Sequence, residues 1–198
     1  MPQSVQAAGS VTAPSASRSV AAASASAIRS LSGSGSPAPS QVASGATAAD
    51  PSLFAIVGAD ATKGLTFQYD GETTARVAAD PGLARDASAL AIGLYTVTGQ
   101  APASDYAIVS VVRLRDPHPD EVWFRAYRDS YDTSACAQAG GVARHAQTNI
   151  GGRTVFVAGC TGGAFAYHVF VPAHGAVVSI TAVGPGRLGD RIAGAIEN

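Results

Sequence analysis

The side chains that could carry chemistry in this 198-residue chain include four histidines, His118, His145, His168 and His174. Two of them, His145 and His168, fall in runs that alternate between polar and apolar residues. They could ligate a metal together if their strands are neighbours and both rings face the same way. We interpret each histidine as an ordinary surface or half-buried side chain, and we expect no metal site.

A short acidic cluster precedes a predicted helix and contains Asp116, His118, Asp120 and Glu121. Its carboxylate oxygens are the ligands that hard cations prefer. Acidic residues are also common in the first turn of a helix, where the helix dipole favours negative charge. We therefore interpret this cluster as the start of a helix.

The chain has two cysteines, Cys136 and Cys160, 24 positions apart. They could form a structural disulfide, a nucleophile with its resolving thiol, or two independent buried thiols. Cys136 is expected near the C-terminus of a helix, where the dipole raises the pKa of a thiol and disfavours a reactive thiolate. We predict a Cys136–Cys160 bridge worth roughly 3–4 kcal/mol in the loop-entropy description.

Four arginines form the candidate ligand or anion site: Arg113, Arg115, Arg144 and Arg153. Arg113 and Arg115 are two apart and share one face of a predicted strand. Arg144 and Arg153 are expected to face each other across a hairpin, beside the amides of Gly151 and Gly152. The alternative is solvated charge that discourages pairing at a sheet edge.

The sequence contains no G-x-S-x-G, P-loop, H-E-x-x-H or C-x-x-C pattern, and we expect no cofactor and no enzyme activity. The formal net charge is −1 with 13 Lys and Arg residues, which gives no concentrated basic surface for nucleic acid. No apolar run approaches the ~20 residues of a membrane-spanning helix.

Residues 1–49 differ in composition from the rest, because Ala and Ser make up more than half of them. Such a segment cannot bury enough apolar surface to offset the entropy of ordering it. We predict a disordered tether over 1–49 and a single domain over 50–198. We also expect a leader or membrane anchor upstream of Met1, the alternative being a cytosolic protein with a flexible N-terminus.

The strongest pattern predicts a four-stranded antiparallel meander. Its runs alternate with period two and are separated by glycine-containing turns: Ala143–Asn149, Arg153–Gly159, Ala164–Val171 and Ala176–Val183. Before it, Tyr106–Arg115 predicts a central strand and Asp120–Ser134 a helix, and after it Arg187–Ile196 predicts a last helix. The order from about residue 105 is thus β-α-β-β-β-β-α, an α+β fold, with both helices placed on one face of the sheet.

The helix over Asp120–Ser134 is expected to face the sheet with one stripe of residues. That stripe contains Val122, Trp123, Ala126, Tyr127, Ser130 and Tyr131, and Trp123 is expected to be buried. The outer face is expected to carry Arg125, Arg128, Asp129 and Asp132.

Earlier in the domain, Pro51–Val57 predicts a short helix, Leu65 to Tyr69 a strand, and Glu72–Ala79 one or two helical turns. Pro81–Tyr95 shows an apolar stripe at helical spacing and is predicted as a helix, with a strand over Leu90–Val97 as the competing interpretation.

In its order of elements, Asp50–Ile196 resembles the small exported α+β domains of the PsbP/Mog1 type found on bacterial envelope lipoproteins. No motif of that group is matched residue by residue, so the resemblance implies no site. Together with the tether and the cysteine pair, it favours a non-enzymatic, secreted or cell-envelope domain that binds a small ligand or a protein partner. A hydrolase or redox enzyme with a dispersed site is the alternative, and an accessory domain serving only interaction within a larger complex is a third possibility.

Overall fold

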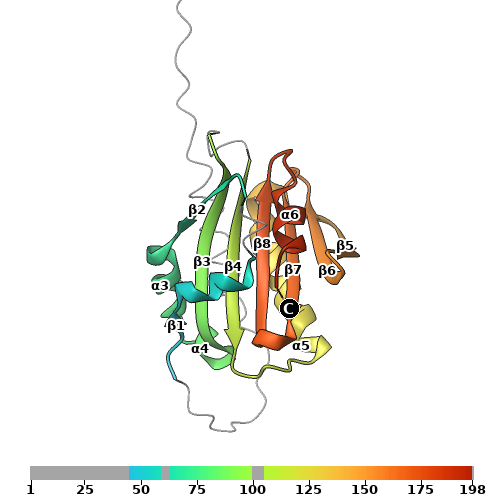
Figure 1. Ribbon diagram of the computed structural model, residues 1–198. Helices are drawn as coiled ribbons and strands as arrows, with labels where there is room; N and C mark the ends of the chain where they lie inside the picture. The colour runs from blue at the N-terminus through green and yellow to red at the C-terminus, as the bar shows by residue number, and fades with distance from the viewer. Residues whose placement is uncertain (1–44, 59–62, 100–104, 198) are drawn as a thin grey trace, which may run out of the picture.

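The computed structural model describes residues 45–58, 63–99 and 105–197, and it contains one twisted, mostly antiparallel sheet. Along the sheet the strand order is β1-β3-β4-β8-β7-β6-β5, with β2 pairing beside β1 on the free edge of β3 (Figure 1). The predicted α+β class is confirmed. The predicted order β-α-β-β-β-β-α from β4 onward is confirmed as well.

The meander folds as its alternating pattern predicts. It comprises β5 (Val142–Ile150), β6 (Arg153–Cys160), β7 (Phe165–Val171) and β8 (Ala176–Val183). The Gly151-Gly152 turn has positive φ at both residues, which glycine adopts without steric cost. β8 then pairs with β4 (Tyr106–Leu114), so the hairpins extend from the centre of the sheet to the edge at β5.

The predicted helix over Pro81–Tyr95 is wrong. Only α4 (Leu83–Asp86) is helical there, and β3 (Ala87–Val97) follows as the longest strand. A strand covered on both faces is apolar at nearly every position, and such a run also satisfies helical spacing. Gly93 fits this strand for a steric reason, because a Cβ there would lie 2.5 Å from the Phe67 ring.

Helices cover both faces of the sheet. On one face lie α6 (Leu188–Gly194) and the 3-10 helix η2 (Pro51–Ile56), which share a core with the inward side chains of β4, β7 and β8. On the other face lie α5 (Glu121–Cys136) and the short α3 (Gly71–Ala78) and α4 (Figure 1). The prediction that the crossover helix and the terminal helix share one face is therefore wrong.

The predicted inner face of α5 is partly wrong. Tyr127 and Tyr131 are buried as expected, whereas Val122 is 79% exposed and Trp123 only half-buried. Asp132, predicted to face solvent, is 2% exposed. The helix is rotated relative to the expected stripe because Asp132 has buried polar partners on the sheet.

Residues 1–44, most of the predicted tether over 1–49, lie outside the described residues. The described part begins at Gly45, ahead of the predicted boundary at Asp50. Thr47 is buried and donates a hydrogen bond to the Ala87 carbonyl, and β1 (Ala48–Ala49) pairs with β3. β2 (Leu65–Tyr69) forms where predicted. None of the helices in the described residues combines the length and the hydropathy needed to cross a membrane.

Candidate functional site

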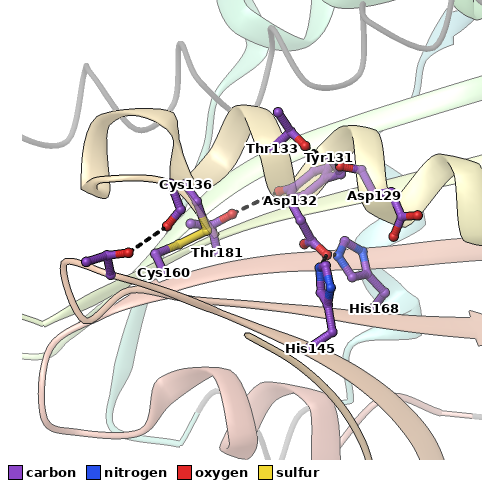
Figure 2. The surroundings of a disulfide bond; sticks show 11 residues. Asp129, Tyr131, Asp132, Thr133, Cys136, His145, Cys160, His168 and Thr181 are labelled. Atoms are coloured by element: carbon purple, nitrogen blue, oxygen red, sulfur yellow. Dashed lines mark hydrogen bonds and ion pairs between the residues drawn. A yellow bond between two sulfur atoms is a disulfide. The ribbon is translucent and has the colours of Figure 1, made fainter. Parts of the chain in front are cut away.

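A disulfide joins the C-terminal end of α5 to the end of β6. Cys136 and Cys160 are bonded, their Cα atoms are 5.2 Å apart, and both side chains are buried (Figure 2). Cys160 stands opposite Val142 in the hairpin, so the chain entering β5 brings the helix end to the sheet. The predicted bridge is confirmed.

The bridge decides between the chemical roles open to these cysteines. No free cysteine remains in the chain, so a nucleophile with a resolving thiol and a pair of independent thiols are both set aside. Structural disulfides persist outside the reducing cytosol. The pair therefore indicates an oxidising, extracytoplasmic environment.

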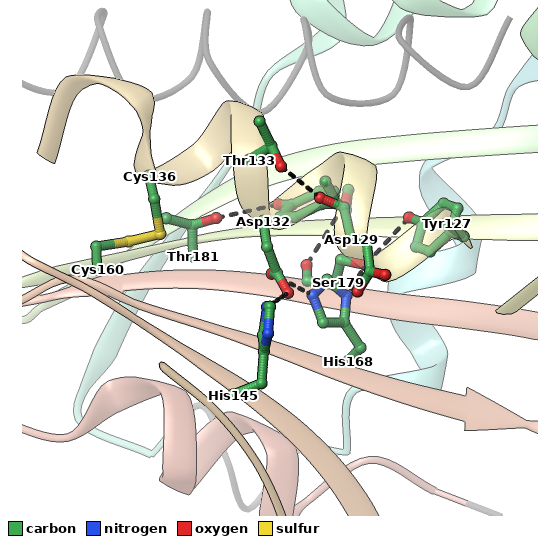
Figure 3. Close-up of polar contacts among 12 residues, drawn as sticks. Tyr127, Asp129, Asp132, Thr133, Cys136, His145, Cys160, His168, Ser179 and Thr181 are labelled. Carbon is green, nitrogen blue, oxygen red and sulfur yellow. Dashed lines mark hydrogen bonds and ion pairs between the residues drawn. A yellow bond between two sulfur atoms is a disulfide. The ribbon is translucent and has the colours of Figure 1, made fainter. Parts of the chain in front are cut away.

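One turn of helix before the disulfide, a chain of polar side chains, buried except at its His145 end, connects α5 to the sheet. Tyr127 Oη lies 3.0 Å from Ser179 Oγ, and Ser179 Oγ lies 2.9 Å from His168 Nδ1. His168 Nε2 lies 2.8 Å from Asp132 Oδ1. His145 Nε2 on β5 then lies 3.2 Å from Asp132 Oδ2 (Figure 3). We call these five residues the polar relay.

Neutral imidazole rings allow one assignment of hydrogens that satisfies every member of the polar relay. The Tyr127 hydroxyl donates to Ser179, the Ser179 hydroxyl donates to His168 Nδ1, and His168 Nε2–H donates to Asp132. The Asp132 carboxylate accepts a second hydrogen bond from His145 Nε2–H. Burial raises the pKa of the Tyr127 hydroxyl, which keeps it protonated as this donor.

The order Ser179, His168, Asp132 resembles the Ser-His-Asp triad of hydrolases, but the two ring nitrogens are exchanged, with serine on Nδ1 and aspartate on Nε2, and access to the serine differs as well. Ser179 is fully buried, His168 is 1% exposed, and the rings of Tyr127 and Tyr131 meet the His168 ring edge to face. A nucleophile needs a reacting carbonyl within reach of its oxygen. Ser179 Oγ is closed off by the core between α5 and β8.

The solvent-facing end of the polar relay opens into a groove between α5 and the β5–β6 hairpin. The groove encloses about 320 Å³. It is lined by Arg125, Arg128, Asp129 and Asp132 from the helix and by His145, Ala146, Gln147, Phe156 and Val157 from the hairpin. Asp132 thus lies at the base of the groove, and His145, whose side chain is 55% exposed, lies at its rim.

The four arginines of the predicted anion site do not come together. Arg113 lies 3.7 Å from the Asp50 carboxylate, and Arg115 donates to the backbone carbonyls of Ala84 and Gly45. Arg113 lies on β4 and Arg115 directly after it. In the sheet, β4 is separated from β5 by β8, β7 and β6.

Within the hairpin itself, Arg144 stands opposite Gly159 and Arg153 opposite Ile150, so these two arginines are not cross-strand partners. The Gly151 amide lies in a turn packed against the end of α6, where a Cβ on Gly151 would lie 2.4 Å from the Gly194 carbonyl oxygen.

The remaining candidates serve local structure. The Asp116 carboxylate accepts a hydrogen bond from the His118 backbone, and Asp120 caps α5 by accepting from the Trp123 N–H. His118 and His174 are exposed. Across the described ranges, no three His, Cys, Asp or Glu side chains are grouped in a way that could hold a metal ion.

The described residues also line two hollows elsewhere on the surface. One, of about 400 Å³, is bordered by α4, the end of β4 and Trp123, with Asp86 and Arg115 among its lining residues. The other, of about 540 Å³, is bordered by η2, β2 and β3 and is lined mainly by apolar side chains such as Phe67 and Tyr95. Neither contains a member of the polar relay.

Sequence reasoning missed the polar relay because its hydrogen-bonded partners are 11 to 52 positions apart. A signal was present in β8, where Ser179 and Thr181 place hydroxyls at alternate positions of an otherwise apolar strand. Buried hydroxyls require partners, and Tyr127 and Tyr131 on the facing helix supply them at 3.0 and 3.1 Å.

A scan of protein-family models, a search of curated proteins and a search of solved structures each found no match to this chain.

Proposed function

We propose that the protein is a non-enzymatic binding domain, secreted or attached to the cell envelope, that holds a small ligand in the groove between α5 and the β5–β6 hairpin. The disulfide supports an oxidising location. The resemblance in element order to exported domains of the PsbP/Mog1 type agrees with this placement.

The observation that carries the proposal is the pre-organised wall of the groove. Asp132 is held by His168 at 2.8 Å, and His168 is held in turn by Ser179 at 2.9 Å. This buried support fixes the Asp132 carboxylate and, through it, the half-exposed His145 ring. Binding sites gain affinity when their polar groups are held in place before the ligand arrives.

The experiment compares wild type with a variant whose groove is filled. Gln147 is exposed on β5 and lines the groove, so Gln147→Trp should occupy it while suiting the strand. Both immobilised proteins are incubated with a small-molecule extract of the native extracellular fraction, and the retained compounds are identified by mass spectrometry. We expect at least one compound to be enriched several-fold on wild type over Gln147→Trp, and identical sets on the two proteins would contradict the proposal.

A hydrolase is the second candidate, favoured by the connected Ser179, His168 and Asp132 side chains. We rank it lower because a substrate would have to displace α5 to reach Ser179 Oγ, which is fully buried. Hydrolysis of p-nitrophenyl esters by wild type, abolished in Ser179→Ala, would reverse this ranking.

A further inference from the structure

Arg128 is a charged side chain of the groove that is held against two aromatic rings. Its guanidinium carbon lies 3.6 Å from the centre of the Phe156 ring and 5.0 Å from the centre of the Phe124 ring. These two rings meet edge to face, with centres 5.5 Å apart. They fix the plane of the guanidinium by cation–π contact and exclude water from part of it.

Among the described residues, Arg128 forms no hydrogen bond and no ion pair, and its Nε–H is buried without an acceptor. Neighbouring Arg125, in contrast, pairs with Glu121 at 2.9 Å. Burial lowers the pKa of Arg128, although the nearby Asp129 and Asp132 carboxylates act in the opposite direction. Because Nε is enclosed, an acceptor can reach this guanidinium only at its terminal nitrogens, on the side of the groove.

We propose that the groove recognises its ligand through a carboxylate group, which the terminal nitrogens of Arg128 bind in a bidentate manner. This inference rests on the function proposed above and names the chemical class of the ligand. A guanidinium held flat by aromatic rings matches the two oxygens of a carboxylate and loses little freedom on binding them.

The rest of the lining selects among anions. The carboxylates of Asp129 and Asp132 share the same wall and oppose a dianion such as a phosphate monoester more strongly than a single negative charge. The Phe156 ring, on the face of the hairpin that meets α5, provides apolar surface directly beside Arg128. The expected ligand is therefore a small monocarboxylate with an apolar or aromatic body.

The test uses benzoate, benzamide and phenyl phosphate as probes of equal aromatic body, titrated by calorimetry into wild type and three variants. Arg128→Gln removes the charge, and Arg128→Lys keeps it without the planar fork. Arg113→Gln removes an equivalent charge that lies outside the groove and pairs with Asp50. Amide NMR spectra of each protein report both folding and the location of the bound probe.

We expect benzoate to bind in the groove more tightly than benzamide or phenyl phosphate. The affinity for benzoate should fall roughly tenfold or more in Arg128→Gln, because charge-assisted hydrogen bonds are lost. It should also fall in Arg128→Lys and stay unchanged in Arg113→Gln. Equal binding of benzoate by wild type and a folded Arg128→Gln would overturn the inference, and so would tighter binding of phenyl phosphate. If benzamide binds in the groove as tightly as benzoate, the groove is still a binding site but the preference for a carboxylate is rejected. If no probe binds in the groove, the result counts against both the binding function and the carboxylate preference.

Discussion

At the scale of single residues, four of the five members of the polar relay are buried, and the stability that they contribute depends on complete pairing. Ser179 is its central member, because its one hydroxyl meets both Tyr127 and His168. A buried donor or acceptor left without a partner costs more than its hydrogen bond contributed. The free energy of unfolding should therefore fall clearly when a single side-chain oxygen of the polar relay is removed.

Ser179→Ala should lower the free energy of unfolding by about 1–3 kcal/mol, because it leaves the Tyr127 hydroxyl and His168 Nδ1 unpaired. The matched control is Ser88→Ala on β3, whose hydroxyl donates to a backbone carbonyl in a more exposed position. That control should stay within about 0.5 kcal/mol of wild type. Urea denaturation of both variants measures the difference, and equal losses would argue against a tightly paired relay.

Asp86 offers a pH-dependent test at the same scale. Burial raises its pKa above the ordinary 3.8, against the opposing effects of Arg85 and a hydrogen bond from Trp123. The folded state thus holds the proton more tightly than the unfolded state, so the stability contributed by the protonated group is present at low pH. It is lost as the pH rises from the unfolded pKa through the folded one.

Asp86→Asn removes this dependence while keeping an acceptor for Trp123. The stability of wild type relative to Asp86→Asn should therefore be lower at about pH 7 than at about pH 3. Comparing the two proteins with each other cancels the other carboxylates that titrate in the same range. An increase in the relative stability of wild type over this interval would contradict the assigned shift.

At the scale of elements, α5 is attached to the sheet at two places. The disulfide holds its last residue, and the hydroxyl pairs Tyr127–Ser179 and Tyr131–Thr181 hold its middle turns to β8. The helix contributes one wall of the groove, and the β5–β6 hairpin contributes the other. The geometry of the groove therefore depends on both attachments.

Replacing both cysteines, Cys136→Ala with Cys160→Ala, should cost about 3 kcal/mol of unfolding free energy, because the unfolded chain regains the freedom of the 24-residue loop. Urea denaturation with and without reductant measures the loss, and the double variant should be insensitive to reductant. Equal stability of oxidised wild type and the double variant would contradict a structural role. Two free thiols in denatured protein from its native compartment would contradict the oxidising location.

At the scale of the whole molecule, the sequence predicted what is local. The meander follows from alternation and glycine turns, because each hairpin is specified within about twenty residues. The segment of β3 is predicted as a helix because burial on both faces removes the alternation that marks a strand. The faces assigned to the helices depended on long-range packing, and here α5 and α6 lie on opposite sides of the sheet.

The candidate site was the least predictable part for the same reason. Charge alone groups Arg113 and Arg115 with Arg144 and Arg153, but three strands separate β4 from β5 and two separate it from β6. Asp132 looked like a surface residue because its partner His168 is 36 positions away in the chain. Only the sheet order brings His145, His168 and α5 to one place.

A chemical-shift map of the oxidised protein with a set of small fragments of mixed charge shows directly whether the groove binds small ligands. Fragments that bind should shift the backbone amides of Ala146, Gln147 and Val157, which line the groove. The amides of Leu114 and Phe67, which line the other two hollows, should stay unchanged. Shifts confined to Leu114 or Phe67, with the groove amides unmoved, would contradict the assignment of the groove as the binding site.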